Sequence, residues 1–433
     1  MSFYGSLGTA VQGINAQAVA IGHISENVAN ATSNGYKQVN TAFHDLVTNK
    51  LQGEGPFVDS TRNMGVMATA DFANRRQGQI VRDSSATSIA VSGNGFIPVM
   101  KPTGVDPLTR EPTGFEDAVY YTRLGDFRLD NSNRLVNSAG YYLQAAEVGG
   151  TTPEDFVVDD ADIAAEPTST VNYRANLPAS ALTGRTFANG IGIIDADGVE
   201  RSFQMAWEKT ANNTWELTIN TADGTPASFG PVTVTFNNGV LDTMVSGDAA
   251  LAVTATGAAT ASFSTDFGAG AQAITVNLGE FGGGFDVDAT SSLTQYASQT
   301  SDITNFDINQ NGLRGGQFTN VTFDEDGQII YNYTNSRSQV GGQLLLANFA
   351  EPDRLDRADG TAFLETRASG EVVFGNPNAD GMGSIVASAL EQSNVDVAEQ
   401  MTRLIVAQQA YSMNGQVLTA SDQMMSRAID MKR

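Results

Sequence analysis

Two columns of apolar residues, one at each end of the chain, constrain the fold more than any other feature of the sequence. In the C-terminal column apolar residues stand seven apart, with Met401 between them: Leu390, Val397, Leu404, Tyr411, Leu418 and Met425. The N-terminal column has the same spacing, with Val11 and Ala18 at intervening positions: Leu7, Ile14, Ile21 and Val28. Apolar residues at heptad spacing predict helices whose apolar stripe packs on another helix. We therefore expect the two ends of the chain to pair as a coiled coil.

The partner of these columns is left open by the pattern alone. One interpretation is a helical hairpin that closes a single molecule, and the other is packing shared among several copies. Gln408, Asn414 and Asp422 lie at or near the C-terminal column, where they would make a poor isolated core. Packing among copies buries such residues on more sides, so the sequence favours it.

Between the two helices the apolar period changes to two, which is typical of β-strands. Phe203, Met205 and Trp207 alternate with polar residues before a turn at 211–213, and Trp215 and Leu217 alternate after it. Similar short strands, punctuated by Gly, Asn and Asp, recur from residue 86 to residue 349. The predicted fold class is therefore mainly β with α-helical termini, built from nested antiparallel β domains.

A change in composition marks the predicted domains. Residues 146–290 are rich in Thr, Ala, Gly and Asp, and the segments on either side of them resemble each other in character. The prediction has four parts: a terminal helical coiled-coil domain at 1–34 and 384–433, a connecting extended region at 35–80 and 366–383, a β domain at 81–145 and 291–365, and an inserted outer β domain at 146–290.

The charge and the cysteine count exclude several kinds of protein. The 48 acidic residues outnumber the 24 basic ones, and the formal net charge is −24. Phosphate backbones and anionic membranes need a basic surface, so we expect no nucleic-acid partner. No apolar run reaches the length of a membrane span, so we expect no membrane insertion. The chain contains no cysteine, which excludes disulfides and thiol chemistry. Its N-terminus lacks the pattern of a secretory signal peptide, so export would need another route.

No group of residues predicts catalysis, a metal site or a cofactor. The two histidines, His23 and His44, lie outside any metal-ligand pattern. Residues 307–312 match the opening of a calcium loop, but Phe318 stands where that loop needs a bidentate glutamate. We therefore expect a protein that is not an enzyme and that has no catalytic residue, cofactor or metal.

Two motifs near the ends of the chain resemble the signatures of one family. The N-terminal motif runs from Asn27 to Lys37 and includes Asn27, Asn30, Thr32, Gly35 and Tyr36. The C-terminal motif consists of Ser393, Asn394, Val395 and Asp396, followed by Met401 and the run 405–411. Together they resemble the bacterial flagellar rod and hook axial proteins. Within that family, residues 88–96, 326–330 and 342–349 resemble the hook proteins in particular.

This resemblance implies a structural subunit that polymerises helically. Hook subunits form a curved, hollow tube, which acts as a universal joint between rod and filament. Their implied partners are further copies of the same chain, the flagellar rod, the hook cap, the hook–filament junction protein and the export apparatus. The implied location is the hook of the flagellum, outside the cell after type III export.

Two alternatives remain at this point. A distal-rod-like subunit of the same family would form a stiffer tube, but such proteins are typically shorter. A secreted β-rich binding protein that uses residues 146–290 is the other alternative. The resemblance to hook proteins further predicts that the glycine-containing terminal helices order only on assembly, since Gly5, Gly8, Gly13 and Gly22 each weaken a helix by about 1 kcal/mol.

Overall fold

The computed structural model describes residues 3–47, 63–109, 111–284, 289–297, 302–358, 361–379 and 381–430. The chain forms two compact units. Unit 1 comprises residues 1–160, 320–332 and 338–433, and unit 2 comprises residues 161–319 and 333–337. The fold is mainly β with one helix near each end of the chain, as the sequence predicts. Residues 48–62 of the predicted connecting region lie outside the described residues.

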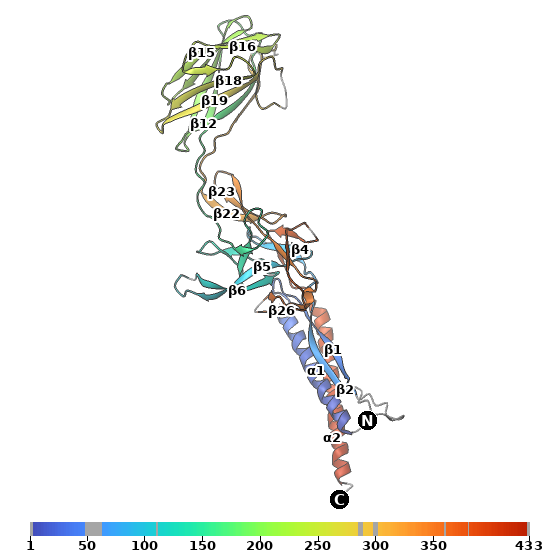
Figure 1. The fold of residues 1–433 in the computed structure, drawn as a ribbon. Coiled ribbons are helices and arrows are strands. Elements are labelled where there is room, and N and C mark those ends of the chain that lie inside the picture. The colour runs from blue at the N-terminus through green and yellow to red at the C-terminus, as the bar shows by residue number, and fades with distance from the viewer. Residues whose placement is uncertain are drawn as a thin grey trace. The chain divides into compact units, whose positions relative to one another are not determined.

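Unit 1 contains both α-helices and strands from the two ends of the chain (Figure 1). Its first part consists of α1 (Phe3–Ala29), β1 (Val39–Val47), β2 (Asn63–Phe72), β3 (Ile80–Arg82), β4 (Ile89–Ser92), β5 (Ile97–Val105), β6 (Pro112–Thr122), β7 (Arg128–Leu129), β8 (Leu135–Val136), β9 (Tyr142–Ala145) and β10 (Glu154–Asp155). Its second part holds most of β22 (Phe318–Phe323) and of β23 (Gln328–Tyr333), then β24 (Ser338–Gln343), β25 (Leu346–Asn348), a 3-10 turn (Pro352–Arg354), β26 (Asp356–Arg357), β27 (Ala362–Leu364), β28 (Val373–Gly375), β29 (Ser384–Ala387), β30 (Ala389–Glu391) and α2 (Val397–Asp430).

Strands from the two parts of unit 1 pair with each other. β30 is antiparallel to β3, with Glu391 opposite Ile80, and β29 is antiparallel to β4. β27 adds to the sheet formed by β6, β5, β9, β8 and β7. Behind this sheet, aromatic side chains from both parts pack together, including Phe96, Tyr121, Phe349 and Phe363. The segment that leads into α2 is therefore held against the segment that follows α1.

Helix α2 begins later than the start of the predicted helical domain. Asp396 caps it, because its Oδ1 accepts hydrogen bonds from the N–H groups of Ala398 (2.9 Å) and Glu399 (3.2 Å). The residues just before it form β29 and β30, in which Ile385 and Ala389 are buried. Leu390, the first member of the predicted column, consequently lies in β30 and not in the helix. No proline interrupts α2 from Val397 to Asp430.

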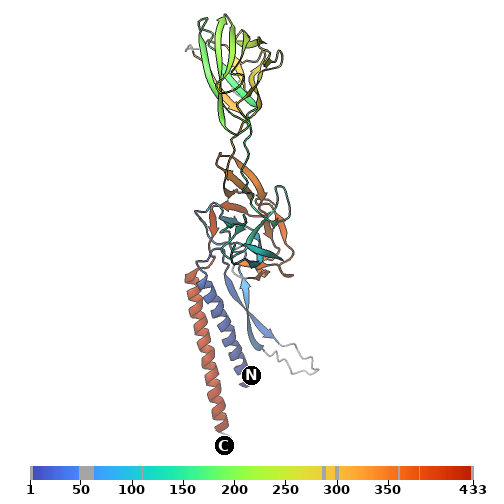
Figure 2. The same cartoon turned by 90° about the vertical axis from the view of Figure 1, so that its left-hand side faces the viewer.

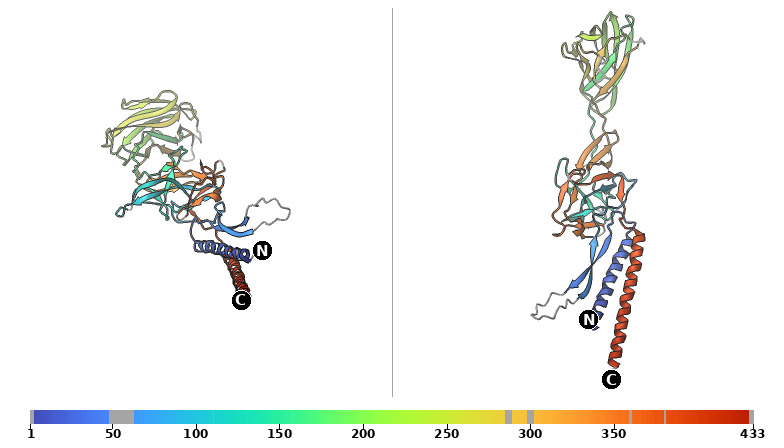
Figure 3. Two further views of the ribbon diagram at one scale, coloured as in Figure 1. Left: turned by 60° about the horizontal axis from the view of Figure 1, so that its bottom comes forward. Right: turned by 90° about the vertical axis from the view of Figure 1, so that its right-hand side faces the viewer.

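The helices lie side by side, and the antiparallel pair β1–β2 packs against α1 (Figures 2 and 3). Gly65 in β2 has a φ of +123°, and a Cβ placed there would lie 1.7 Å from Oε1 of Gln12 in α1. A side chain at residue 65 would therefore be strained by this φ and would displace the Gln12 side chain.

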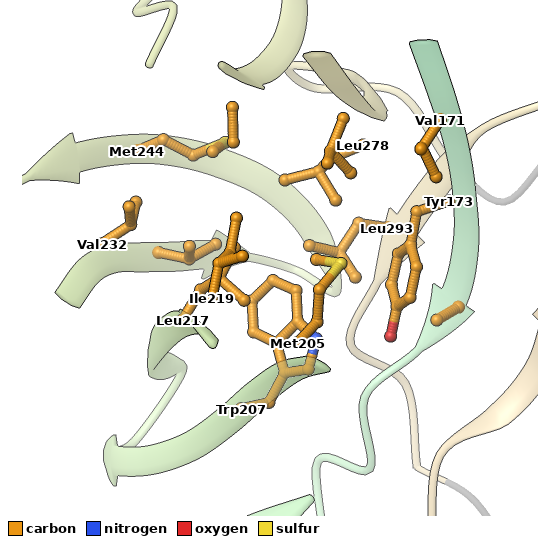
Figure 4. Packing of buried hydrophobic residues seen from close by; sticks show 14 of the residues in the cluster. Val171, Tyr173, Met205, Trp207, Leu217, Ile219, Val232, Met244, Leu278 and Leu293 are labelled. Carbon is orange, nitrogen blue, oxygen red and sulfur yellow. The ribbon is translucent and has the colours of Figure 1, made fainter. Parts of the chain in front are cut away.

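The described part of unit 2 consists of strands, joined by turns and loops, around one apolar core (Figure 4). The strands are β11 (Thr170–Asn176), β12 (Thr186–Ile194), β13 (Glu200–Ala211), β14 (Thr214–Thr221), β15 (Ser228–Asn237), β16 (Val240–Ser246), β17 (Leu251–Val253), β18 (Ala258–Asp266), β19 (Ala271–Glu280), β20 (Ser292–Thr294) and β21 (Thr304–Gln310). The predicted hairpin at 203–219 forms, with Trp207 opposite Leu217. Burial alternates along β14, as a sheet with one buried face requires.

Candidate assembly site

The two terminal sequence motifs meet in unit 1, where Asn27 and Asn394 each cross-link backbone segments. The Asn27 side chain accepts a hydrogen bond from the N–H of Val39 (2.9 Å) and donates to the carbonyl of Val39 (2.7 Å). It also donates to Oε1 of Gln400 in α2 (3.2 Å). Both Asn27 and Gln400 are buried. One amide thus ties the end of α1 to the start of β1 and to the first turn of α2.

Asn394 does the same for the C-terminal motif. Its Oδ1 accepts a hydrogen bond from the N–H of Gln38 (2.7 Å), and its Nδ2 donates to the carbonyls of Arg76 (2.8 Å) and Ala73 (3.2 Å). Gly35 has a left-handed φ of +70°, and its N–H donates to the carbonyl of Glu391 (2.7 Å). A Cβ at residue 35 would lie 2.8 Å from the backbone nitrogen of Leu124, so only glycine fits there.

A buried cluster of three charges lies beside these asparagines. Nζ of Lys37 is 2.6 Å from Oε1 of Glu391, and Nη1 of Arg123 is 3.2 Å from Oε2. Their side chains are 1%, 1% and 3% exposed for Lys37, Glu391 and Arg123 respectively. The backbone completes the site, because Lys37 donates to the carbonyl of Arg76 (2.9 Å) and Arg123 donates to that of Gly93 (2.7 Å). Two cations therefore share one carboxylate out of contact with water.

The electrostatics of this cluster follow from its burial and its net positive charge. Burial is the main reason why the pKa of Lys37 is lowered to about 8 from its ordinary value of 10.5. Glu391 raises the pKa of Lys37, and Arg123 lowers it. Burial likewise lowers the pKa of Arg123, while Glu391 raises it. Glu391 is the counter-ion that both buried cations share, so it is the residue on which the cluster depends.

The other motif residues lie around this junction. The Tyr36 hydroxyl donates to Oδ1 of Asn27 (3.1 Å), and the guanidinium of Arg357 stands 4.9 Å from the centre of the Tyr36 ring. Asn30 donates only to the carbonyl of Glu26, one helical turn back (3.0 Å). Thr32 is exposed, and Ser393 and Val395 are half-buried. The motifs therefore combine buried junction residues with surface residues.

The two helices contact each other through small and polar side chains. Asn27 meets Gln400, and a Cβ placed on Gly13 would lie 2.9 Å from Nδ2 of Asn414. Midway between these contacts, the buried residues Ala20 and Ala407 line one groove. The contacts advance by seven residues along both helices in opposite directions, so the helices are antiparallel. On α2 this contact column consists of Gln400, Ala407, Asn414 and Ser421.

The predicted apolar columns lie beside this contact and not in its centre. On α2, Leu404, Leu418 and Met425 are half-buried, whereas Val397, Met401 and Tyr411 are exposed. On α1, Leu7, Ile14, Ile21 and Val28 are half-buried, and Val11 and Ala18 are exposed. The single subunit thus leaves much of the predicted apolar surface uncovered.

Further apolar side chains of α2, which the sequence prediction did not include in its column, are still more exposed. The side chains of Val406, Met413 and Met424 are exposed to similar extents, at 61%, 60% and 61%. Val406 and Ala410 also line a groove of about 320 Å³ between α1, β1 and α2, together with Phe43 of β1. Large apolar patches that remain exposed on a soluble chain mark surfaces that bind other proteins.

Replacing Asn27 with alanine is expected to destabilise unit 1 by about 1–3 kcal/mol, because the buried N–H and C=O groups of Val39 lose their partner. Denaturant unfolding followed by helical circular dichroism measures this loss, since both helices belong to unit 1. Asn30→Ala serves as the control, because it removes only local bonds near the surface and should cost less. Equal costs for the two variants would contradict the role assigned to Asn27.

Sequence reasoning missed Arg123 and Glu391 entirely. Lys37 ended the N-terminal motif, but nothing in its neighbourhood indicated a buried charge. The three residues are far apart in the chain, and a charged residue beside a strand ordinarily faces water. Only the pairing of β30 with β3 brings Glu391 to Lys37.

Other polar groups that the sequence drew attention to have structural partners. His23 bonds to the Thr41 hydroxyl through Nδ1 (2.9 Å), and His44 bonds to that of Thr69 through Nε2 (3.0 Å). Asp307, in the stretch that resembles a calcium loop, pairs with Arg174 (2.9 Å). Among the described residues, no three His, Asp or Glu side chains come together as a metal site requires. Neither α1 nor α2, over the residues described, is apolar enough to cross a membrane.

Comparison with known proteins points to one family. The family model described as "Flagellar basal body rod FlgEFG protein C-terminal" matches residues 386–431, and "Flagellar hook protein FlgE/F/G D1 domain" matches residues 90–173. The chain is 30% identical over 446 residues to the flagellar hook protein FlgE of Brucella abortus, with 100% of both chains covered. It is 27% identical over 455 residues to that of Salmonella typhimurium, covering 99% of this chain and 100% of the relative. A crystal structure of the Helicobacter pylori flagellar hook protein FlgE2 aligns with a TM-score of 0.47 at 12% identity, over 72% of this chain and 100% of that one.

Proposed function

Because this chain belongs to the flagellar hook protein family, we propose that its two terminal helices are the elements through which copies of it polymerise. The chain is a structural subunit of the bacterial flagellar hook, and the hook of the flagellum is where it resides. Family membership supports self-assembly in general terms.

The observation that carries the proposal is the uncovered apolar surface of α2. Eight large apolar side chains of this helix are each more than a third exposed: Val397, Met401, Ile405, Val406, Tyr411, Met413, Val417 and Met424. Burial in a neighbouring copy would gain about 25 cal/mol for each Å² of apolar surface removed from water. We propose that α1 and α2 pair as a coiled coil in the polymer and that the predicted columns become buried there.

The polar junction has a different role in this proposal. The buried bonds of Asn27, Asn394 and Glu391 fix the directions in which the two helices leave the β part of unit 1. Assembly along a helix requires every copy to present its helices at the same angle. The junction thus acts as a positioning element, and the helices provide the contacts.

The inserted region 146–290 and the β domain are proposed to form the outer layers of a curved tube. The rod, the hook cap, the hook–filament junction protein and the export apparatus are proposed as further partners. The absence of cysteine and the glycines of α1 are compatible with passage of the unfolded chain through an export channel.

The test replaces Leu404 with aspartate. Leu404 is half-buried beside the α1 contact, and the polymer would bury it further. A carboxylate buried without a partner costs at least about 2 kcal/mol, enough to raise the critical concentration for polymerisation by more than about tenfold. Sedimentation and electron microscopy measure the polymer, and tryptophan fluorescence reports whether unit 2 remains folded, because both tryptophans are buried there.

Ser412→Asp provides the matched control, since residue 412 is exposed on the same helix. We expect it to polymerise at a concentration much closer to that of the unchanged chain. The proposal fails if Leu404→Asp still forms tubes at the concentration at which the unchanged chain does.

A further inference from the structure

Helix α2 carries a second apolar stripe in addition to the predicted column. Its members are alternately four and three residues apart, the spacing of a coiled-coil contact surface. We call this stripe the α2 seam: Val406, Ala410, Met413, Val417, Ala420 and Met424. Apart from the half-buried Ala410, all of these residues are exposed. A continuous coiled-coil surface is therefore present, and most of it is left uncovered by the residues that the structure describes.

Helix α1 has a stripe of the same kind, which we call the α1 seam. It consists of the predicted N-terminal residues Leu7, Val11, Ile14, Ala18, Ile21 and Val28. Its spacing again alternates between four and three residues, apart from the gap at Ser25. At a rise of about 1.5 Å per residue, the α1 seam is about 32 Å long and the α2 seam about 27 Å long. The two seams match in spacing and nearly match in length.

The seams lie on opposite faces of the α1–α2 pair. Three α1 seam residues each follow an α2-facing residue by one position: Ile14 follows Gly13, Ile21 follows Ala20 and Val28 follows Asn27. Three α2 seam residues each precede an α1-facing residue: Val406 precedes Ala407, Met413 precedes Asn414 and Ala420 precedes Ser421. One residue turns an α-helix by about 100°. The helices are antiparallel. The residue after a contact residue on α1 and the residue before a contact residue on α2 therefore point to opposite sides of the helix pair.

The groove between α1, β1 and α2 lies beside the start of the α2 seam. Val406 and Ala410, the first two residues of the α2 seam, line it. The α1 residues that line it are Gln17, Ala20 and Ile24, none of which belongs to the α1 seam. The α2 seam therefore begins at the groove, whereas no residue of the α1 seam lines it.

We infer that the α1 seam of one copy packs against the α2 seam of the next copy, with the groove side of each pair covered by the following subunit. This inference rests on the proposed role of the helices in polymerisation and specifies which faces meet. A contact between two different faces cannot close on a twofold axis, so it repeats from copy to copy. It produces an open helical assembly when the rotation between copies does not close a ring. A second copy is the occupant that the sequence supports, because this chain itself carries the complementary seam.

The absence of cysteine allows a direct test by disulfide cross-linking between separately marked chains. One chain carries Ile14→Cys or Ala18→Cys, and the other carries Met413→Cys or Val417→Cys. The two chains are mixed, assembled and oxidised, and covalent dimers are measured on a non-reducing gel. Cysteine is small and apolar, so it suits a buried seam. A disulfide forms only if the two Cα atoms approach to about 4.4–6.8 Å.

We expect at least one of the four seam combinations to yield covalent dimers in the assembled mixture at a level several-fold above that of either chain alone. Ser412→Cys, paired with the same α1 variants, is the control, because it is exposed on α2 outside the seam. Intact tubes in which no seam combination cross-links, or in which Ser412→Cys cross-links equally well, would overturn the inference and leave the proposed function standing.

Two other outcomes are distinguishable. If cysteine-marked chains assemble only with an excess of the unchanged chain, the cross-links are measured in those copolymers. We again expect seam combinations to form more covalent dimers than the Ser412→Cys control. If the unchanged chain itself forms no polymer, the proposed function fails and the inference fails with it. Seam-dependent cross-linking to a different added protein, in place of a second copy, would also overturn the inference.

Discussion

Replacing Glu391 with glutamine is expected to lower the free energy of unfolding of unit 1 by about 3–5 kcal/mol, the usual cost of removing one partner from a buried ion cluster. Glu391 is the carboxylate shared by Lys37 and Arg123. Without it, Lys37 can lose its proton, since burial has already lowered the pKa of its ammonium group to about 8. Arg123 cannot be deprotonated, and it would remain charged, buried and without a counter-ion.

The measurement is denaturant unfolding with two signals. Helical circular dichroism follows unit 1, which contains α1 and α2, and fluorescence follows unit 2, which contains Trp207 and Trp215. Only the unfolding transition of unit 1, seen by circular dichroism, should move to a lower denaturant concentration. Glu351→Gln is the control, because Glu351 pairs with Arg75 (3.2 Å) while 61% exposed, and such pairs contribute about 1 kcal/mol or less. If Glu391→Gln, like Glu351→Gln, lowers the free energy of unfolding by less than about 1 kcal/mol, the cluster does not stabilise the junction.

Replacing Trp207 with alanine is expected to destabilise unit 2 by about 3–5 kcal/mol. Trp207 is fully buried in the core of that unit, close to Tyr173, with ring centres 6.3 Å apart (Figure 4). Removing so large a side chain loses its transfer free energy and leaves a cavity that the surrounding strands cannot fill. Trp215 remains as the fluorescent reporter in β14.

Leu182→Ala tests whether the effect of Trp207→Ala comes from burial. Leu182 belongs to the same unit but is 77% exposed, so its truncation should change stability by less than about 0.5 kcal/mol. The helical transition of unit 1 should stay in place in both variants. A shift of that transition by Trp207→Ala would contradict the division of the chain into two compact units.

The Glu391 prediction concerns the junction that positions the helices, and the Trp207 prediction concerns the core of unit 2. Neither concerns the assembly contact itself. Glu391 is proposed to hold the helices in the right direction, and its loss should reduce polymerisation only as far as it destabilises unit 1. Leu404→Asp, in contrast, should block polymerisation while unit 2 stays folded. Comparing the polymer yield with the unfolding free energy separates positioning residues from contact residues.

Local patterns in the sequence were sufficient for the elements and for the family. Period-two alternation around 203–219 determined a hairpin, because the side chains of a strand point alternately to its two faces. Heptad columns and terminal motifs determined a helix near each end and a resemblance to flagellar axial proteins. These signals lie within stretches of about ten to thirty residues, where spacing reflects the geometry of a single element.

Only the tertiary structure decided which face of each helix meets the other. Helix α2 contains more than one apolar stripe, and periodicity cannot tell which of them is covered. The covered column holds Gln400, Ala407, Asn414 and Ser421, residues that a search for apolar periodicity passes over. Small side chains let the helix backbones approach, and Asn27 donates a hydrogen bond to the buried Oε1 of Gln400, so close packing outweighs the larger apolar residues nearby.

The charge cluster depended on tertiary structure in the same way. Lys37, Arg123 and Glu391 come from three distant segments, and each alone has the sequence context of a surface residue. Pairing of β3 with β30 helps to bury these three side chains, and burial removes their charges from water. The sequence by itself therefore determined the helices, the hairpins and the family, because these follow from local spacing. The junction and the choice of which helix faces are covered needed the fold, because burial and facing are properties of distant segments brought together.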